Sequence, residues 1–311
     1  MHRIAAGVVG IFSLVCLAGC SGLKQIQDTM TKFDEGVHSV ATAEMNFFRA
    51  VQTADCSNQF YAKAYEYAVD NKGSFDLTGA CTPTILDDKE ILIRQALMDS
   101  ITLYADKMVA LATSDSDKSL DANAQKLAGR INGLAKQGGF SDLSLASGVQ
   151  SAIIAISEMA LDQKRFDNLR ESASAMAPHL KSVVDALKSE NVNFAYGIAG
   201  KTAGVEGYLR EVVAATHHEQ GQLSFFRIVQ ARRIVQSVNP FSPETIAASA
   251  GGGDLSRDPH NVALQINVTL DSVVNANQAI AGAGTGGLIA AVNDLVVRAK
   301  AAQNVQGALN Q

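Results

Sequence analysis

Hydrophobic residues recur along this chain at alternating spacings of three and four, which places them on one face of an α-helix. Sustained stripes of this kind form bundle or coiled-coil seams, and several stripes joined by short turns favour antiparallel neighbours. The sequence therefore predicts an all-α fold, an elongated antiparallel bundle of long amphipathic helices with coiled-coil-like seams. The stripes are Leu97, Ile101, Tyr104, Met108 and Leu111; Leu120, Ala124, Leu127, Ile131 and Leu134; Phe166, Leu169, Ala173, Met176, Leu180, Val183 and Leu187; Ile266, Leu270, Val273, Asn277 and Ile280; and Leu288, Val292, Leu295 and Ala299.

Glycines, prolines and polar clusters divide these stripes into elements. Residues 143–189 form either one helix with a kink at Pro178 or two helices that meet there, because proline removes a backbone donor. Residues 239–259 hold three prolines and three glycines and are expected to be a long loop. The expected organisation is a bundle over 20–238, this loop, and a C-terminal hairpin over 260–311 that packs on the bundle. The other expected helices span about 23–54, 57–71, 84–113, 118–137, 191–217, 221–238, 260–281 and 287–305.

The N-terminus has the pattern of an export signal. One fixed positive charge, Arg3, precedes an uncharged apolar run over residues 4–17, and small residues then lead into Cys20. A basic start, an apolar core of this length and small residues at a cleavage point are typical of signal peptides. The run is shorter than the roughly 20 apolar residues that span a bilayer. An ordinary signal peptide with a chance cysteine is the alternative interpretation.

The tetrapeptide Leu-Ala-Gly-Cys at residues 17–20 resembles the lipobox of bacterial lipoproteins, although the resemblance covers only residues 1–22. It implies that residues 1–19 are a signal peptide and that Cys20 carries diacylglycerol, usually with a fatty acid such as palmitate on the new amine. Ser21 follows the cysteine, which in Gram-negative members implies sorting to the outer membrane, facing the periplasm. Two or three acyl chains make a stable anchor, because each buried methylene contributes roughly 0.8 kcal/mol. We expect no transmembrane helix in the mature chain.

Cysteine usage agrees with export. Of the four cysteines, Cys56 and Cys81 remain once Cys16 leaves with the signal and Cys20 is acylated. Two thiols in an oxidising compartment most simply pair. Closing such a loop stabilises the fold by roughly 3.5 kcal/mol in the chain-entropy account. Two separate buried or redox-active thiols are the alternative, although the sequence has no Cys-x-x-Cys motif.

Composition excludes some classes of partner. The chain has a net charge of −5, which argues against nucleic acid because that affinity comes from clustered cations. Signals for an enzyme are poor, and we expect no catalytic residues, no metal and no cofactor. His217, His218 and Glu219 are adjacent in sequence, so they point to different sides of a helix. Two metal ligands on one helix face need a spacing of three or four.

Two segments are candidates for binding. Gly197, Gly200, Gly204 and Gly207 repeat at spacings of three, four and three, which on a helix makes a smooth face that another backbone can approach closely. Close packing inside the bundle is one interpretation of this face, and a partner-docking groove or a hinge is the other. The loop 239–259 is either a plain connector or a binding segment.

The sequence thus favours a membrane-anchored periplasmic lipoprotein that acts as a non-enzymatic interaction or scaffold protein of the cell envelope. Its expected contacts are the membrane, through Cys20, and a protein partner in the periplasm. An immunity- or inhibitor-type protein that neutralises a toxin or hydrolase is the alternative, because its sequence would have the same profile. A membrane-inserting hairpin over 276–297 is disfavoured by its polar side chains Asn277, Asn293 and Asp294.

Overall fold

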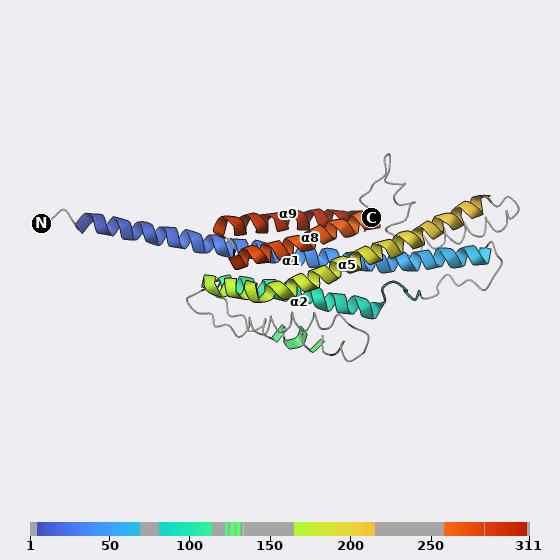
Figure 1. Ribbon diagram of the computed structural model, residues 1–311, viewed down its shortest axis with the longest axis horizontal. Helices are drawn as coiled ribbons and strands as arrows, with labels where there is room; N and C mark the ends of the chain where they lie inside the picture. The colour runs from blue at the N-terminus through green and yellow to red at the C-terminus, as the bar shows by residue number, and fades with distance from the viewer. Residues whose placement is uncertain are drawn as a thin grey trace. The chain divides into compact units, whose positions relative to one another are not determined.

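The chain is all-α in the part that the structure describes. The computed structural model describes residues 5–68, 81–113, 165–214, 258–282 and 284–309, and some residues between 122 and 133 (Figure 1). These residues contain no strand, which confirms the predicted fold class. None of the described helices carries a stretch long and apolar enough to cross a membrane. The helices are α1 (Ala5–Ala68), α2 (Asp88–Thr113), α5 (Arg165–Ala214), α8 (Pro259–Gly282) and α9 (Thr285–Leu309).

The predicted stripes form the hydrophobic core. Their side chains are buried wherever the structure describes them, and each fully buried large apolar side chain contributes roughly 1.5–3 kcal/mol. The pair α8 and α9 agrees closely with the two helices predicted at the end of the chain. The buried stripe residues include Leu97, Ile101, Tyr104, Met108, Leu111, Leu127, Leu169, Ala173, Met176, Leu180, Val183, Leu187, Ile266, Leu270, Val273, Asn277, Ile280, Leu288, Val292, Leu295 and Ala299.

Side-chain caps decide where α2 and α8 begin. Asp87 Oδ1 accepts the backbone N–H of Glu90 at 2.7 Å, and Glu90 Oε2 accepts the N–H of Asp87 at 2.9 Å. This reciprocal capping box provides acceptors for two backbone N–H groups. One of them, that of Glu90, lies in the first turn and has no partner inside the helix. The capping box starts α2 at Asp88 instead of the predicted residue 84. Asp258 likewise accepts the N–H groups of the second and third residues of α8. Pro259 suits the first position, because it has no N–H group that would need a partner there.

The predicted break between residues 54 and 57 is wrong. α1 continues through this point without interruption, from Ala5 to Ala68. Asp55 has a low intrinsic helix propensity, but its carboxylate is engaged by donors from outside the helix, as described below. These tertiary contacts outweigh the local preference.

The predicted helix boundary near residue 190 is also wrong, and the alternative left open at Pro178 is resolved. α5 is one helix from Arg165 to Ala214 and passes through Pro178. Ser182 Oγ donates to the carbonyl of Pro178 at 2.9 Å. Asn191, which looked like part of a turn, is fully buried within the helix and hydrogen-bonded to neighbouring helices. Residues 143–164 of the predicted helix lie outside the described part.

The chain forms two compact units, and each described helix contributes a segment to both. Unit 1 comprises residues 1–39, 96–183 and 271–299, and unit 2 comprises residues 40–95, 184–270 and 300–311. In unit 1, Asn277 of α8 joins three helices. Its Oδ1 accepts the Tyr104 hydroxyl of α2, and its Nδ2 donates to the carbonyl of Ala173 in α5 at 3.0 Å.

Gly36 allows α1 and α9 to approach closely within unit 1. A Cβ atom at Gly36 would lie 2.8 Å from Leu295 Cγ, a distance that real Cβ contacts essentially never show. Leu295 Cγ is the branch point of a fully buried side chain, so it cannot move away without disturbing the core. Glycine is therefore needed here for packing, although it is a poor helix former.

The substitution Gly36→Ala should lower the free energy of unfolding by roughly 1–3 kcal/mol, because overpacking outweighs the gain of about 1 kcal/mol in helix propensity. Gly200→Ala is the matched control, since nothing lies within 4 Å of the added methyl group and α5 should gain stability. Urea unfolding followed by circular dichroism measures both. Equal stabilisation of the two variants would contradict the packing at Gly36.

Candidate functional site

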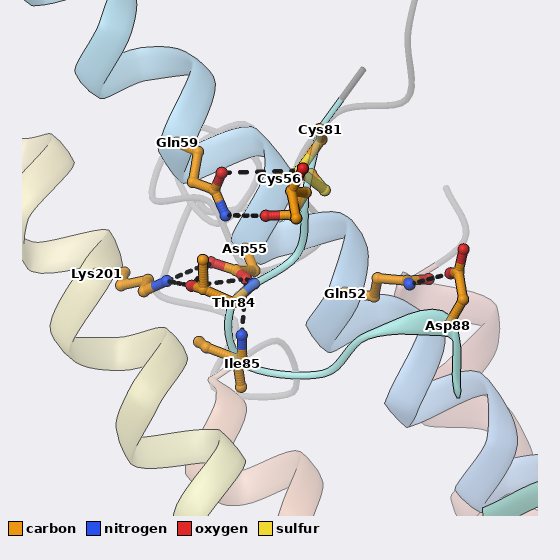
Figure 2. Close-up of a disulfide and its surroundings, with 10 residues drawn as sticks. Gln52, Asp55, Cys56, Gln59, Cys81, Thr84, Ile85, Asp88 and Lys201 are labelled. Atoms are coloured by element: carbon orange, nitrogen blue, oxygen red, sulfur yellow. Dashed lines mark hydrogen bonds and ion pairs between the residues drawn. A yellow bond between two sulfur atoms is a disulfide. The ribbon is translucent and has the colours of Figure 1, made fainter. Parts of the chain in front are cut away.

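Cys56 and Cys81 form a disulfide, as the sequence predicted. Figure 2 shows that the bond ties α1 to the segment that leads into α2. The two Cα atoms lie 5.5 Å apart across a separation of 25 positions. One turn further along α1, Gln59 Nε2 donates to the carbonyl of Thr82 at 3.1 Å. The first residues of the segment 81–87 are therefore held against α1.

Asp55 holds the same segment one turn before Gln59. Its buried Oδ2 accepts the backbone N–H groups of Thr84 and Ile85, the latter at 2.9 Å (Figure 2). The ammonium group of Lys201 in α5 donates to Asp55 Oδ1 and to Thr84 Oγ1. Burial alone would raise the pKa of Asp55, but the lysine and the two N–H donors outweigh it and lower the pKa below its ordinary value. Asp55 therefore has a structural role, in which it links α1 to α5 and to the segment before α2.

The glycine stripe of α5 is packed at one end and open further along. A Cβ atom at Gly197 would lie 3.3 Å from Ile85 Cδ1, so α5 packs closely against the segment before α2. Gly200 and Gly204 have nothing within 4 Å of an added Cβ. The surroundings of Gly207 lie outside the described residues. That a partner docks on this stripe stays a prediction.

Glu44 is a carboxyl group enclosed in the core of unit 2. Its side chain is fully buried, and Asn191 Nδ2 donates to its Oε2 at 3.2 Å. The other oxygen, Oε1, has no hydrogen-bond partner. Burial raises the pKa of Glu44 to about 8, against the opposing effects of the Asn191 hydrogen bond and of Arg94. Glu44 is therefore protonated in the folded protein at neutral pH.

The neighbouring polar side chains of unit 2 are hydrogen-bonded to one another, although Asn191 Oδ1 has no partner. Asn191 also donates to Asn267 Oδ1 at 2.9 Å, and Asn267 donates in turn to a backbone carbonyl of α5 at 3.2 Å. Arg94 makes two hydrogen bonds to the Glu190 carboxylate, at 2.7 and 3.0 Å. Its guanidinium also lies over the rings of two phenylalanines, 5.1 and 5.6 Å from their centroids. These contacts position the helices relative to one another within unit 2.

An apolar surface on unit 2 is the best candidate for function. We call it the α5–α8 face and define it by Val192 and Tyr196 of α5 and Leu264 and Val268 of α8. Their exposed fractions are 40%, 65%, 60% and 37%. Seven large hydrophobic side chains are exposed among the described residues, and four of them lie on this face. Such concentration on one face marks surfaces that bind other molecules.

The register of two antiparallel helices makes the α5–α8 face continuous. The ring of Tyr196 lies against that of His260, with the centroids 4.4 Å apart. The hydrogen bond between Asn191 and Asn267, further along both helices, shows that they run in opposite directions. One turn from the ring contact, Val192 is therefore opposite Leu264. This face was not predicted from the sequence, because one short apolar stripe on each helix becomes a surface only when the two helices are paired.

Several residues singled out in the sequence lie outside the described part of the structure. The side chain of Cys20 lies outside the described residues, as do His217, His218 and Glu219. Nearly all of the predicted loop, residues 239–257, lies outside them as well. The chain matches no protein-family model, and neither curated proteins nor solved structures are significantly similar to it.

Glu44 makes stability depend on pH with a defined sign. An unfolded glutamate loses its proton near pH 4.5, whereas the folded protein keeps it up to about pH 8. The free energy of unfolding should fall between these two pH values by an amount on the order of 3–5 kcal/mol and stay low above them. Glu44→Gln keeps a neutral hydrogen-bonding group and should remove most of this dependence, so that the variant is the more stable protein at pH 9.

Urea unfolding of both proteins at pH 5, 7 and 9 measures the effect. Glu66→Gln is the matched control, because it makes the same substitution at an exposed position of α1 in the same unit. If Glu44→Gln and the unmodified protein lose stability in parallel from pH 5 to pH 9, the buried carboxyl group does not carry the dependence.

Proposed function

We propose that this chain is a lipoprotein anchored through Cys20 to the outer membrane, where it faces the periplasm and acts as a non-enzymatic interaction or scaffold protein. The observation that carries the proposal is the exposed α5–α8 face. It surrounds a tyrosine, a residue type enriched among those that dominate the energy of protein interfaces, with aliphatic neighbours. The lipobox at residues 17–20 supports the anchor.

The expected occupant of the α5–α8 face is a protein with an apolar surface of its own. Tyr196 has the largest exposed fraction on the face and a hydroxyl group that can pair with a partner's backbone. His260 supports the ring from the side, which reduces the entropy that Tyr196 would lose on binding. A partner that is a toxin or a hydrolase would make the chain an immunity- or inhibitor-type protein, and the identity of the partner distinguishes these two functions.

The anchor is tested by growing cells with a radioactive fatty acid. The unmodified protein should be labelled and should fractionate with membranes, whereas Cys20→Ala should take up no label, because the acylated sulfur is missing. Cys16→Ala is the matched control and should remain labelled, since residue 16 lies within the predicted signal peptide. Label retained by Cys20→Ala, or a mature chain that begins at Met1, would contradict the anchor.

The docking face is tested by placing a photo-crosslinking amino acid at position 196 in intact cells. A discrete product, identified by mass spectrometry, should form from this position. It should not form from position 63, an exposed site of α1 in the same unit. Leu264→Ser should reduce the product from position 196 by about tenfold, because replacing this apolar side chain with a hydroxyl group should weaken binding by about 1.4 kcal/mol. The same products from both positions, or none from position 196, would rule out this face.

A further inference from the structure

Three potential metal ligands converge in unit 1. Asp34 and His38 lie one turn apart on α1, and Asp106 reaches them from α2. His38 Nε2 lies 2.9 Å from Asp106 Oδ1 and 3.5 Å from Asp34 Oδ1. One nitrogen and two carboxylate oxygens thus lie within 4.8 Å of one another. The side chain of His38 is half exposed, so solutes can reach the cluster from the solvent.

The charges of this cluster are not balanced by the imidazole. His38 directs one ring nitrogen at two carboxylates, and a single N–H can serve only one of them well. Asp34 Oδ1 is closed to solvent and has no hydrogen-bond partner. This oxygen faces the imidazole nitrogen at 3.5 Å, beyond the usual length of a hydrogen bond, at the point where the three ligands converge.

We propose that Asp34, His38 and Asp106 bind a divalent transition-metal ion of the Zn²⁺ class. Zn²⁺ binds imidazole nitrogen and carboxylate oxygen at roughly 2.0–2.2 Å, which in a tetrahedron separates neighbouring ligand atoms by roughly 3.3–3.5 Å. The two distances of 2.9 and 3.5 Å therefore need to change by only a few tenths of an ångström. The imidazole favours such an ion over Mg²⁺ or Ca²⁺, which prefer all-oxygen sites. Water completes the coordination.

The ion would link α1 to α2 within unit 1. Gln27 Nε2 already donates to the carbonyl of Ala112 at 3.3 Å, which joins the same two helices at another point. Binding to the folded state alone stabilises a protein in proportion to the logarithm of the free metal concentration. Zn²⁺ should therefore raise the melting temperature of the full chain progressively, and the increase should require all three ligands.

The test uses the full chain, stripped with a chelator and free of any histidine tag. Titration with Zn²⁺ against a chromophoric competitor should show one site of micromolar or tighter affinity that is lost on substitution of a ligand. His38→Ala and Asp106→Asn should each weaken this site by about tenfold or more. His179→Ala is the matched control, because it removes another partly exposed imidazole of unit 1 and should leave the affinity unchanged. If His38→Ala proves unfolded by circular dichroism, His38→Gln replaces it.

Two results would overturn the proposal. One is the absence of stoichiometric binding by the unmodified protein at about 100 μM Zn²⁺. The other is a site whose affinity is the same in the His38 and Asp106 variants as in the unmodified protein, which would place the metal elsewhere in the chain. In either case the cluster is a polar contact between α1 and α2 and not a metal site.

Discussion

Asparagine amides buried between helices set the register on which both units depend. Apolar stripes can slide along one another at modest cost, but a buried amide that loses its partner costs roughly 1–3 kcal/mol. The hydrogen bonds of Asn277 fix the register of the helices in unit 1, and the hydrogen bond between Asn191 and Asn267 fixes it in unit 2. In unit 2 this register also creates the outer surface, because it places Tyr196 against His260. The polar core and the α5–α8 face are therefore two consequences of the same alignment.

Much of the fold follows from local patterns in the sequence. The stripes, the helix pair at the C-terminus and the disulfide were predictable, because each prediction follows from residue spacing or from the export that the N-terminal pattern predicts. The errors occurred where a residue that is unfavourable in an isolated helix has partners from elsewhere in the chain. Asp55 and Asn191 are the two cases, and each is stabilised by a residue of another element, Lys201 and Asn267 respectively. Propensity cannot reveal such partners.

The candidate sites were less predictable for the same reason. The spacing of four between Asp34 and His38 is visible in the sequence and suits two ligands on one helix face, yet Asp106 is 68 positions away from His38. Glu44 interrupts the apolar stripe of α1, which is a signal that a polar group is buried. The sequence does not show whether such a group is neutral, paired or bound to an ion, because that depends on the helices packed around it.

Glu44 and Asp34 are two carboxylates that lack a full set of hydrogen-bond partners, and they differ in their access to solvent. This access determines whether a proton or an ion can neutralise each of them. Both have one oxygen without a hydrogen-bond partner and a pKa raised by burial. Glu44 is enclosed by the core of unit 2, where a hydrated ion would have to lose its water and displace packed side chains, so only a proton can neutralise it. Asp34 lies beside the half-exposed His38, and an ion there can keep water ligands while it gains three protein ligands. Access to water therefore permits the proposed metal ion at Asp34 and excludes one at Glu44.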